Sequence, residues 1–254
     1  MNTGPAPLAG KVVLVTGAAR RVGAVIAAAL HAAGARVAIH YRSSQSDADA
    51  LVARLSVERA GSARAFRADL ADPAACDTLV TEVVRAFGRL DVLVNNASTF
   101  YPTPFGSITP DQFDDLVGSN LRAPLFLSQA AAPVLAKHEG LILNIGDIHG
   151  LHPLAGHAVY SAAKAGLLML TRSLARELGP AIRVNAIAPG PVMWPERGVD
   201  EALRERIIAR TALKRAGSAD DVAKAALYFA ASAPFVTGQV LAVDGGRLVG
   251  GDAR

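Results

Sequence analysis

Short apolar runs rich in Val, Ile and Leu alternate along the chain with longer segments in which apolar residues recur at helical spacing. The short runs predict buried strands, which we expect at residues 11–16, 36–41, 63–68, 91–95, 141–145, 183–188 and 239–244. The longer segments predict helices at residues 22–33, 46–60, 72–87 and 109–137, a helix that opens at Tyr160, and two helices within 199–231. Strands and helices therefore alternate from end to end.

This alternation predicts an α/β fold, because strands that are apolar on both faces need helices on both sides of the sheet. We expect a single doubly wound parallel sheet of seven strands, of the Rossmann type. No boundary, repeat or low-complexity linker interrupts the pattern, so we expect one domain over residues 1–254, with a flexible tail at 1–8. Ligands bind beyond the carboxyl ends of such strands. The residues at or just past these ends are Thr16, Tyr41, Asp69, Asn95, Asp147 and Pro189.

The composition fits one large folded domain, since 51% of the 254 residues are hydrophobic. Lys and Arg outnumber Asp and Glu by 26 to 22, but they are scattered and not interleaved with aromatic residues, so we expect no nucleic-acid partner. Cys76 is the only cysteine, which excludes an internal disulfide and fits a reducing compartment. Without a secretory signal pattern or an apolar run of membrane-spanning length, we expect a cytoplasmic protein with no membrane partner.

The turn after the first expected strand runs from Thr16 to Gly23 and leads into a helix. Backbone N–H groups and the dipole at the start of a helix favour an anion, and small residues let a phosphate come close to the backbone. Arg20 and Arg21 favour a phosphate ligand here. Tight packing alone also explains a glycine turn at this place.

The loop after the second expected strand indicates which dinucleotide binds. An acidic residue here would bond the adenosine ribose and exclude a 2′-phosphate, but the chain has Tyr41, Arg42 and Ser43. A guanidinium and a hydroxyl suit a ribose phosphate through charge-assisted hydrogen bonds, so we predict NADPH as the cofactor. The alternative is an exposed loop arginine without a ligand.

Tyr160 and Lys164 lie four residues apart on one face of an expected helix. An ammonium close to a phenol favours the phenolate and makes Tyr160 a proton donor or acceptor near neutral pH. Asp147 follows the apolar run 141–145, where a buried strand delivers its side chain to a cleft. Taken alone, the Tyr and Lys pair also fits an ordinary amphipathic helix.

Several further motifs follow one another along the chain. They are Thr16-Gly17 through Gly23, Asp69-Leu70, Asn95-Asn96-Ala97, Asn120, Tyr160 with Lys164, Arg183-Val184-Asn185, Pro189-Gly190, Thr237-Gly238-Gln239 and Asp244-Gly245-Gly246. In this order they resemble the short-chain dehydrogenase/reductase family over essentially the whole chain. The resemblance implies that Tyr160 transfers a proton, that Lys164 binds the nicotinamide ribose and lowers the tyrosine pKa, and that Asn120 supports a proton relay.

The expected cofactor site combines the turn, the loop after the second strand and the positions that the resemblance implies. It comprises Gly17, Arg20, Arg21, Val22, Gly23, Tyr41, Arg42, Ser43, Asp69, Leu70, Asn96, Ala97, Ser98, Tyr160, Lys164, Pro189 and Gly190.

Two departures from the general family pattern look like its pteridine reductase branch, as does the run 95–104. Arg21 replaces the middle glycine of the turn, and Asp147 replaces a serine. A carboxyl group suits proton delivery to, or pairing with, a ring nitrogen. The resemblance implies a flat pterin stacked between the nicotinamide and Phe100. Phe100 is alternatively a loop residue that fills the domain edge. The expected substrate-binding residues are Arg21, Ser98, Phe100, Asp147, Tyr160 and Trp194.

Residues and resemblance together predict an NADPH-dependent reductase that transfers hydride to a C=N bond of a pteridine. The expected substrates are dihydropterins, with folates as a second group. One alternative is a carbonyl reductase of the 3-oxoacyl type, against which Asp147 in place of serine argues. An alternative of another class is a non-catalytic protein that senses NADPH.

Residues 191–215 combine Pro, Gly and the only Trp of the chain, and we expect them to form a lid over the substrate. Trp194 either contacts the substrate or pins the lid. His149, His152 and His157 lack a regular spacing on one helix face, so we expect no metal site and place them at the substrate entrance or a subunit contact. The resemblance implies a homotetramer.

Overall fold

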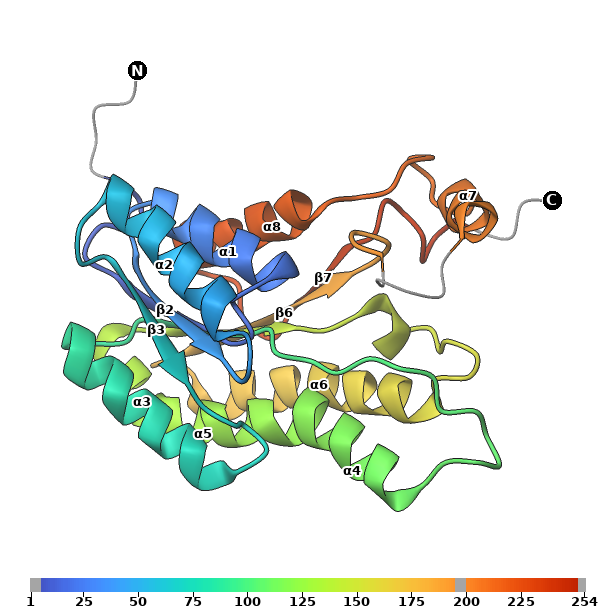
Figure 1. The fold of residues 1–254 in the computed structure, drawn as a ribbon, viewed down its shortest axis with the longest axis horizontal. Coiled ribbons are helices and arrows are strands. Elements are labelled where there is room, and N and C mark those ends of the chain that lie inside the picture. The colour runs from blue at the N-terminus through green and yellow to red at the C-terminus, as the bar shows by residue number, and fades with distance from the viewer. Residues whose placement is uncertain (1–5, 195–199, 251–254) are drawn as a thin grey trace.

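The computed structural model describes residues 6–194 and 200–250, and within them seven strands form one sheet (Figure 1). The strands are β1 (Val12–Val15), β2 (Arg36–Tyr41), β3 (Ala63–Arg67), β4 (Val92–Asn95), β5 (Leu141–Ile145), β6 (Arg183–Pro189) and β7 (Val240–Val243). Their order is β3-β2-β1-β4-β5-β6-β7 and every neighbouring pair is parallel. The predicted α/β fold with a doubly wound seven-stranded sheet is confirmed.

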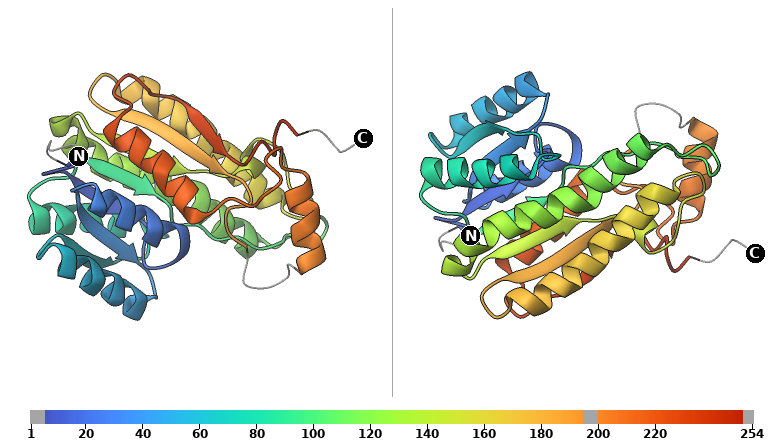
Figure 2. Two further views of the ribbon diagram at one scale, coloured as in Figure 1. Left: turned by 90° about the horizontal axis from the view of Figure 1, so that it is seen from above. Right: turned by 90° about the horizontal axis from the view of Figure 1, so that it is seen from below.

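Helices cover both faces of the sheet (Figures 1 and 2). The first face carries α1 (Arg21–Ala32), α2 (Gln45–Glu58) and α8 (Ala219–Ala231). The opposite face carries α3 (Pro73–Phe87), α5 (Ala123–Leu135) and α6 (Ala158–Leu178), with α4 (Pro110–Val117) continuing the line of α5. The short α7 (Glu201–Ala209) stands at one end of the molecule. Alternate residues of each buried strand therefore enter two separate cores, one on each face.

Side-chain caps fix several helix starts where the sequence predicted them. Asp72 accepts a hydrogen bond from the N–H of Ala74 at the start of α3, and Pro73 occupies the first helical position. Gly88 ends that helix at φ 81°, which other residues rarely adopt. The predicted helix over 72–87 is thus delimited by its own caps.

The expected long helix over 109–137 is confirmed as a continuous helical run that begins at Pro110, but it is not a regular α-helix, because a π-helical turn, η1 (Gly118–Arg122), lies between α4 and α5. The side-chain amide of Asn120 bonds the carbonyl oxygens of Leu116 and Thr99, both at 2.9 Å. The backbone widens at this point, and the N–H of Ala123 reaches the carbonyl of Gly118. A short 3-10 turn, η2 (Ala136–His138), follows α5.

The expected flexible tail over residues 1–8 is wrong at its inner end. Leu8 is buried in the core, and its N–H bonds the carbonyl of Ala33 at 2.9 Å. The packed core therefore includes a residue that precedes the first strand. Residues 1–5 lie outside the described part of the chain.

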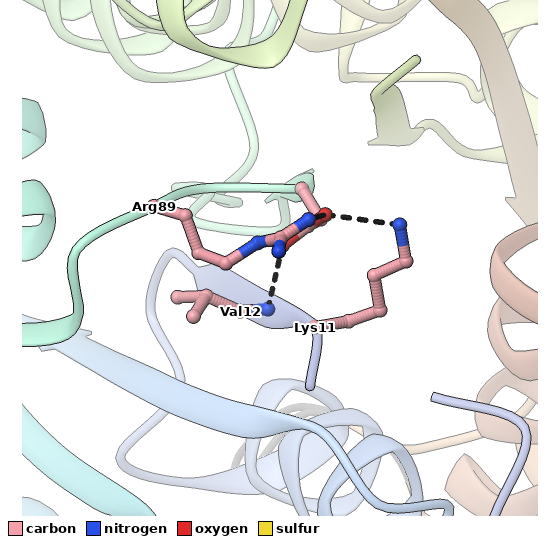
Figure 3. A network of polar contacts seen from close by, with 4 residues as sticks. Lys11, Val12 and Arg89 are labelled. Carbon is pink, nitrogen blue, oxygen red and sulfur yellow. Dashed lines mark hydrogen bonds and ion pairs between the residues drawn. The ribbon is translucent and has the colours of Figure 1, made fainter. Parts of the chain in front are cut away.

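A buried carboxylate anchors the start of β1. Asp91 accepts hydrogen bonds from the N–H of Val12 at 2.9 Å, from Nζ of Lys11 at 3.1 Å and from two nitrogens of Arg89. Figure 3 shows these donors converging. Burial alone would raise the pKa of Asp91, but the hydrogen bonds outweigh burial and lower it.

No helix within residues 6–194 and 200–250 is long and apolar enough to cross a membrane.

Candidate active site

A cavity of about 400 Å³ opens at the carboxyl ends of the strands around the β1/β4 switch point, where the strand order reverses. Most of the expected cofactor residues line this cavity. They are Gly17, Arg20, Arg21, Val22, Gly23, Tyr41, Arg42, Ser43, Asp69, Leu70, Asn96, Ala97 and Ser98. Four expected cofactor residues do not line it, namely Tyr160, Lys164, Pro189 and Gly190.

The turn between β1 and α1 is built for close backbone approach. Gly17 has φ 59°, and a Cβ at Gly23 would lie 2.5 Å from the Asn96 side chain. Arg21 adopts φ 55°, a conformation that favours glycine, and its Nη2 bonds the carbonyl of Trp194 at 3.1 Å. The turn thus combines a glycine cradle with two arginines beside the first turn of a helix, which suits a phosphate.

Side chains from both neighbouring strands hold this turn. From the β4 side, Asn96 Nδ2 donates to the carbonyls of Thr16 at 2.8 Å and Gly17 at 3.2 Å. From the β2 side, Nδ1 of His40 accepts from the N–H of Gly17 at 3.1 Å. The sequence reasoning assigned His40 no role. The available signal was a histidine inside a predicted buried strand, where a polar ring needs partners.

The loop after β2 contributes an arginine and a serine to the lining of the cavity. Arg42 is exposed and lines the cavity next to Ser43 and the buried Tyr41. Asp69 lines the same cavity, and its Oδ1 is occupied by the N–H of Ala71 at 3.1 Å. The loop after β2 therefore offers a free-standing guanidinium and a hydroxyl where the sequence predicted them.

Asp147, Tyr160 and Lys164 come together at the end of β5. The hydroxyl of Tyr160 donates to Oδ2 of Asp147 at 2.8 Å, and the N–H of His149 donates to Oδ1 at 2.8 Å. Nζ of Lys164 donates to the carbonyl of Ile145 at 2.9 Å. A short turn, η3 (Ile148–Gly150), and the start of α6 supply these positions.

Tyr160 and Lys164, on the first two turns of α6, have shifted pKa values. Burial lowers the pKa of Lys164 to about 8, against the nearby charge of Asp147, which raises it. Burial, the charge of Asp147 and its hydrogen bond raise the pKa of Tyr160. The expectation that Lys164 lowers the tyrosine pKa is therefore wrong for this structure. Lys164 Nζ lies 5.7 Å from the centre of the Tyr160 ring, while the carboxylate contacts the hydroxyl directly.

Phe100 borders the same group of side chains. Its ring stacks on His157 with centroids 4.8 Å apart and 10° between the planes. It also meets the Tyr160 ring edge-on at 4.8 Å. With 42% of its surface exposed, Phe100 is neither free-standing nor buried at the domain edge.

The remaining candidates have structural partners. Asn120 is fully buried, and its amide ties η1 to Thr99 in the loop after β4. The ring of Trp194 lies 5.7 Å from the guanidinium of Arg204 on α7, a contact within the expected lid. Gly190 packs closely against Asp244, because a Cβ placed on Gly190 would lie 2.7 Å from the Cα of Asp244. Residues 195–199 of the expected lid lie outside the described residues.

The histidines near Asp147 bond main-chain carbonyls. Nδ1 of His149 lies 3.2 Å from the carbonyl of His152, and Nδ1 of His157 lies 2.9 Å from that of Ala155. Over the described residues, no group of three or more His, Cys, Asp or Glu side chains is placed to hold a metal ion.

Comparisons with known proteins agree on the class of protein. A family model described as enoyl-(acyl carrier protein) reductase matches residues 17–247. The chain is 38% identical to pteridine reductase 1 of Leishmania tarentolae over 97% of this chain and 98% of that protein. It is 35% identical to the 3-oxoacyl-(acyl-carrier-protein) reductase FabG of Staphylococcus aureus over 94% and 98%. A short chain dehydrogenase from Burkholderia cenocepacia J2315, solved in complex with NADP, matches with a TM-score of 0.90 and 39% identity over 95% of this chain and 99% of that chain.

Proposed function

Because the chain belongs to the short-chain dehydrogenase/reductase family, we propose that this oxidoreductase uses NADPH to reduce a C=N bond of a pteridine. The substrates that we propose are dihydropterins, with folates as a second group. Support comes from the chemistry of the residues at the end of β5 rather than from identity values, since a pteridine reductase and a 3-oxoacyl reductase are almost equally similar to the chain.

The cavity at the switch point suits NADPH. Its glycine turn accepts a pyrophosphate near the start of α1, and Arg20 and Arg21 supply positive charge there. Arg42 and Ser43 suit the 2′-phosphate that distinguishes NADPH from NADH. When bound, NADPH supplies the hydride of the reaction.

The contact between Asp147 and Tyr160 carries the proposal. A serine at position 147 would polarise a ketone by donating one hydrogen bond, but a carboxyl group both accepts and delivers protons. Here Asp147 is hydrogen-bonded to a phenol at 2.8 Å and to the N–H of His149 at 2.8 Å. This arrangement suits a ring nitrogen that must gain a proton as its neighbouring carbon gains hydride.

We infer the following proton steps. The substrate gains one hydride at carbon and one proton at nitrogen, so the C=N bond becomes a CH–NH bond. Asp147 delivers the proton, directly or through water, and is protonated again from solvent, while the hydrogen bond from Tyr160 holds the carboxyl group in place. Tyr160 serves as the acid where a second C=N bond is reduced. Lys164, buried behind Tyr160, holds its ammonium on the carbonyl of Ile145 and provides positive charge at the base of the site.

Phe100 supports a flat substrate. Its ring is partly exposed, and the stack on His157 together with the edge contact to Tyr160 fixes its orientation. A planar heterocycle gains both contact area and alignment against such a ring.

A 3-oxoacyl reductase is the second candidate, favoured by the Staphylococcus aureus relative. Asp147 argues against it for the reason given above. A non-catalytic NADPH sensor is the alternative of another class, and the intact group of Asp147, Tyr160 and Lys164 argues against that.

One assay separates these functions. Purified protein is mixed with NADPH and, in turn, with dihydrobiopterin, dihydromonapterin, dihydrofolate and a 3-oxoacyl thioester, and NADPH oxidation is followed by absorbance. We expect oxidation with the pterins. Oxidation with the thioester alone would replace the proposal with a carbonyl reductase, and NADPH binding without any oxidation would favour the sensor.

We also propose a homotetramer. Exposed apolar side chains stand on the outer faces of α4, α5 and α6, namely Phe113, Leu125 and Met169. Phe235 and Leu241 are exposed at the β7 end of the sheet. Apolar surface of this kind favours burial against a partner. Light scattering after gel filtration tests the mass, and a monomer at working concentration contradicts the proposal.

A further inference from the structure

His40 lies in β2 at the junction of two walls of the cavity, with 2% of its surface exposed. Its Nδ1 accepts the N–H of Gly17 at 3.1 Å, and its Nε2 lies 3.1 Å from the carbonyl of Ala68. Its own main-chain carbonyl accepts the N–H of Ala18 at 2.9 Å. His40 therefore binds the N–H groups of Gly17 and Ala18 in the turn between β1 and α1, called the phosphate turn below. It also binds the carbonyl of Ala68, the residue before Asp69.

These partners define the form of the imidazole ring. A carbonyl only accepts and an N–H only donates, so Nε2 carries the hydrogen and Nδ1 presents a lone pair. Burial lowers the pKa of His40 to about 4, although the carbonyl of Ala68 and the charge of Asp69 raise it. The ring is thus neutral near pH 7. A second ring proton would face the N–H of Gly17.

The hydrogen bonds to His40 also decide which groups remain for a ligand. The N–H groups of Gly17 and Ala18 are both committed to His40, so the turn presents its later N–H groups and its two arginines to a phosphate. Ala68 directly precedes the cavity wall of residues 69–71, and its N–H bonds the carbonyl of Tyr41 at 3.1 Å while its carbonyl bonds His40. The imidazole ring of His40 therefore connects the phosphate turn to the chain segment that leads into the wall of residues 69–71.

We propose that His40 is a positioning residue for the dinucleotide, which fixes the turn between β1 and α1 relative to the cavity wall formed by residues 69–71. The inference rests on the proposed function only for the identity of the dinucleotide. It assigns His40 an effect on NADPH affinity and none on the chemical step, because the ring lies away from Asp147 and Tyr160, which do not line the same cavity.

Two variants separate the two contacts. The amide oxygen of an Asn reaches the place of Nδ1, so His40→Asn keeps the bond to Gly17 and loses that to Ala68. The amide nitrogen of a Gln reaches the place of Nε2, so His40→Gln keeps the bond to Ala68 and loses that to Gly17. We expect each to raise the Kd of NADPH about 10-fold, and His40→Leu about 100-fold, in fluorescence titrations. At saturating NADPH, kcat should stay within about twofold of wild type.

A cofactor fragment tests whether each variant affects the phosphate turn or the wall of residues 69–71. Adenosine 2′-phosphate lacks the 5′-phosphate that contacts the turn, and its affinity is measured by competition with NADPH. We expect His40→Gln to leave that affinity within about twofold and His40→Asn to weaken it about 10-fold. General loss of structure would instead lower the affinities for NADPH and for the fragment together in His40→Gln as well. His31→Gln is the matched control, because His31 is also buried with a lowered pKa but does not line the cavity.

The outcomes separate this inference from the proposed function. If His40→Asn, His40→Gln and His40→Leu all bind NADPH within twofold of wild type, the positioning role is wrong and the proposed function stands. If the variants lose affinity as expected but wild type reduces no pterin, the substrate assignment is wrong and the role of His40 stands. A wild-type protein that binds no NADPH overturns both.

Discussion

The hydroxyl of Tyr160 donates to Oδ2 of Asp147 across 2.8 Å, although the two residues lie thirteen positions apart along the chain. Asp147 comes from the loop after β5, and Tyr160 comes from the first turns of α6. Burial and the carboxylate raise the pKa of Tyr160, so the phenol keeps its proton and acts as the donor of the pair. The two residues therefore form one unit for handling protons.

Asp147→Ser should remove proton delivery while leaving the cofactor site intact, because Asp147 does not line the cavity at the switch point. General acid catalysis contributes about 10²–10⁴ in rate, so we expect kcat for a dihydropterin to fall at least about 100-fold. The Kd of NADPH should stay within about twofold. Steady-state kinetics and a fluorescence titration measure both, with the exposed Asp77→Ser as the control. Retained turnover would show that Asp147 is not the proton donor.

Arg42→Asp should change cofactor preference. The exposed guanidinium lines the open end of the cavity, where a carboxylate repels a 2′-phosphate and accepts a ribose hydroxyl. We expect the KM for NADPH to rise about 10- to 100-fold, while that for NADH changes far less. Arg54→Asp on α2 changes the net charge equally away from the cavity and should alter neither value. Equal weakening of both cofactors would contradict the assignment of Arg42.

The sheet was predictable from the sequence because each strand carries its own signal. Runs such as Val12–Val15 are apolar throughout, which is the pattern of a strand buried on both faces. The π-helical turn around Asn120 was not predictable in the same way. It depends on the amide of Asn120 reaching Thr99, a residue brought close only by the fold. Local periodicity contains no information about that contact.

The candidate site was also predictable from the sequence only in part. Motif order placed Gly17 and Arg42 on one cavity and Asp147 beside Tyr160, since parallel strands deliver their ends to one edge of the sheet. The pKa of Tyr160 was predicted with the wrong sign, because spacing on a helix gives the distance to Lys164 but not the burial of the phenol. The stack of Phe100 on His157 likewise joins two loops that no pattern connects.

His40 should make folding stability depend on pH. Its pKa is about 4 in the folded protein and about 6.5 when unfolded, so between these values only the unfolded chain binds the proton. The contribution of His40 is fully present above pH 6.5 and is lost as pH falls to 4, by about 3 kcal/mol in the free energy of unfolding. Urea unfolding from pH 7 to 4 measures it. In His40→Gln the loss should be smaller by that amount, and identical pH profiles would contradict the prediction.

Lys164→Met should make the protein more stable and less active at the same time. Burying the ammonium costs free energy, as shown by a pKa lowered to about 8 against about 10.5 in the unfolded chain. That difference corresponds to about 3 kcal/mol below pH 8, offset by about 1 kcal/mol for the lost hydrogen bond to Ile145. We expect a net gain of about 1–2 kcal/mol in urea unfolding at pH 7. Turnover should fall sharply, because the positive charge at the base of the site is gone.

The gain from Lys164→Met should depend on pH with a definite sign. Between pH 8 and 10.5 the folded wild-type protein releases the proton of Lys164 while the unfolded chain keeps it, so wild-type stability rises relative to the variant. The advantage of Lys164→Met is therefore largest below pH 8 and disappears toward pH 10.5. Lys137→Met, at an exposed lysine, is the control and should show neither the gain nor the pH dependence. A variant that is less stable than wild type at pH 7 would mean that the charge of Lys164, paired with Asp147, stabilises the fold.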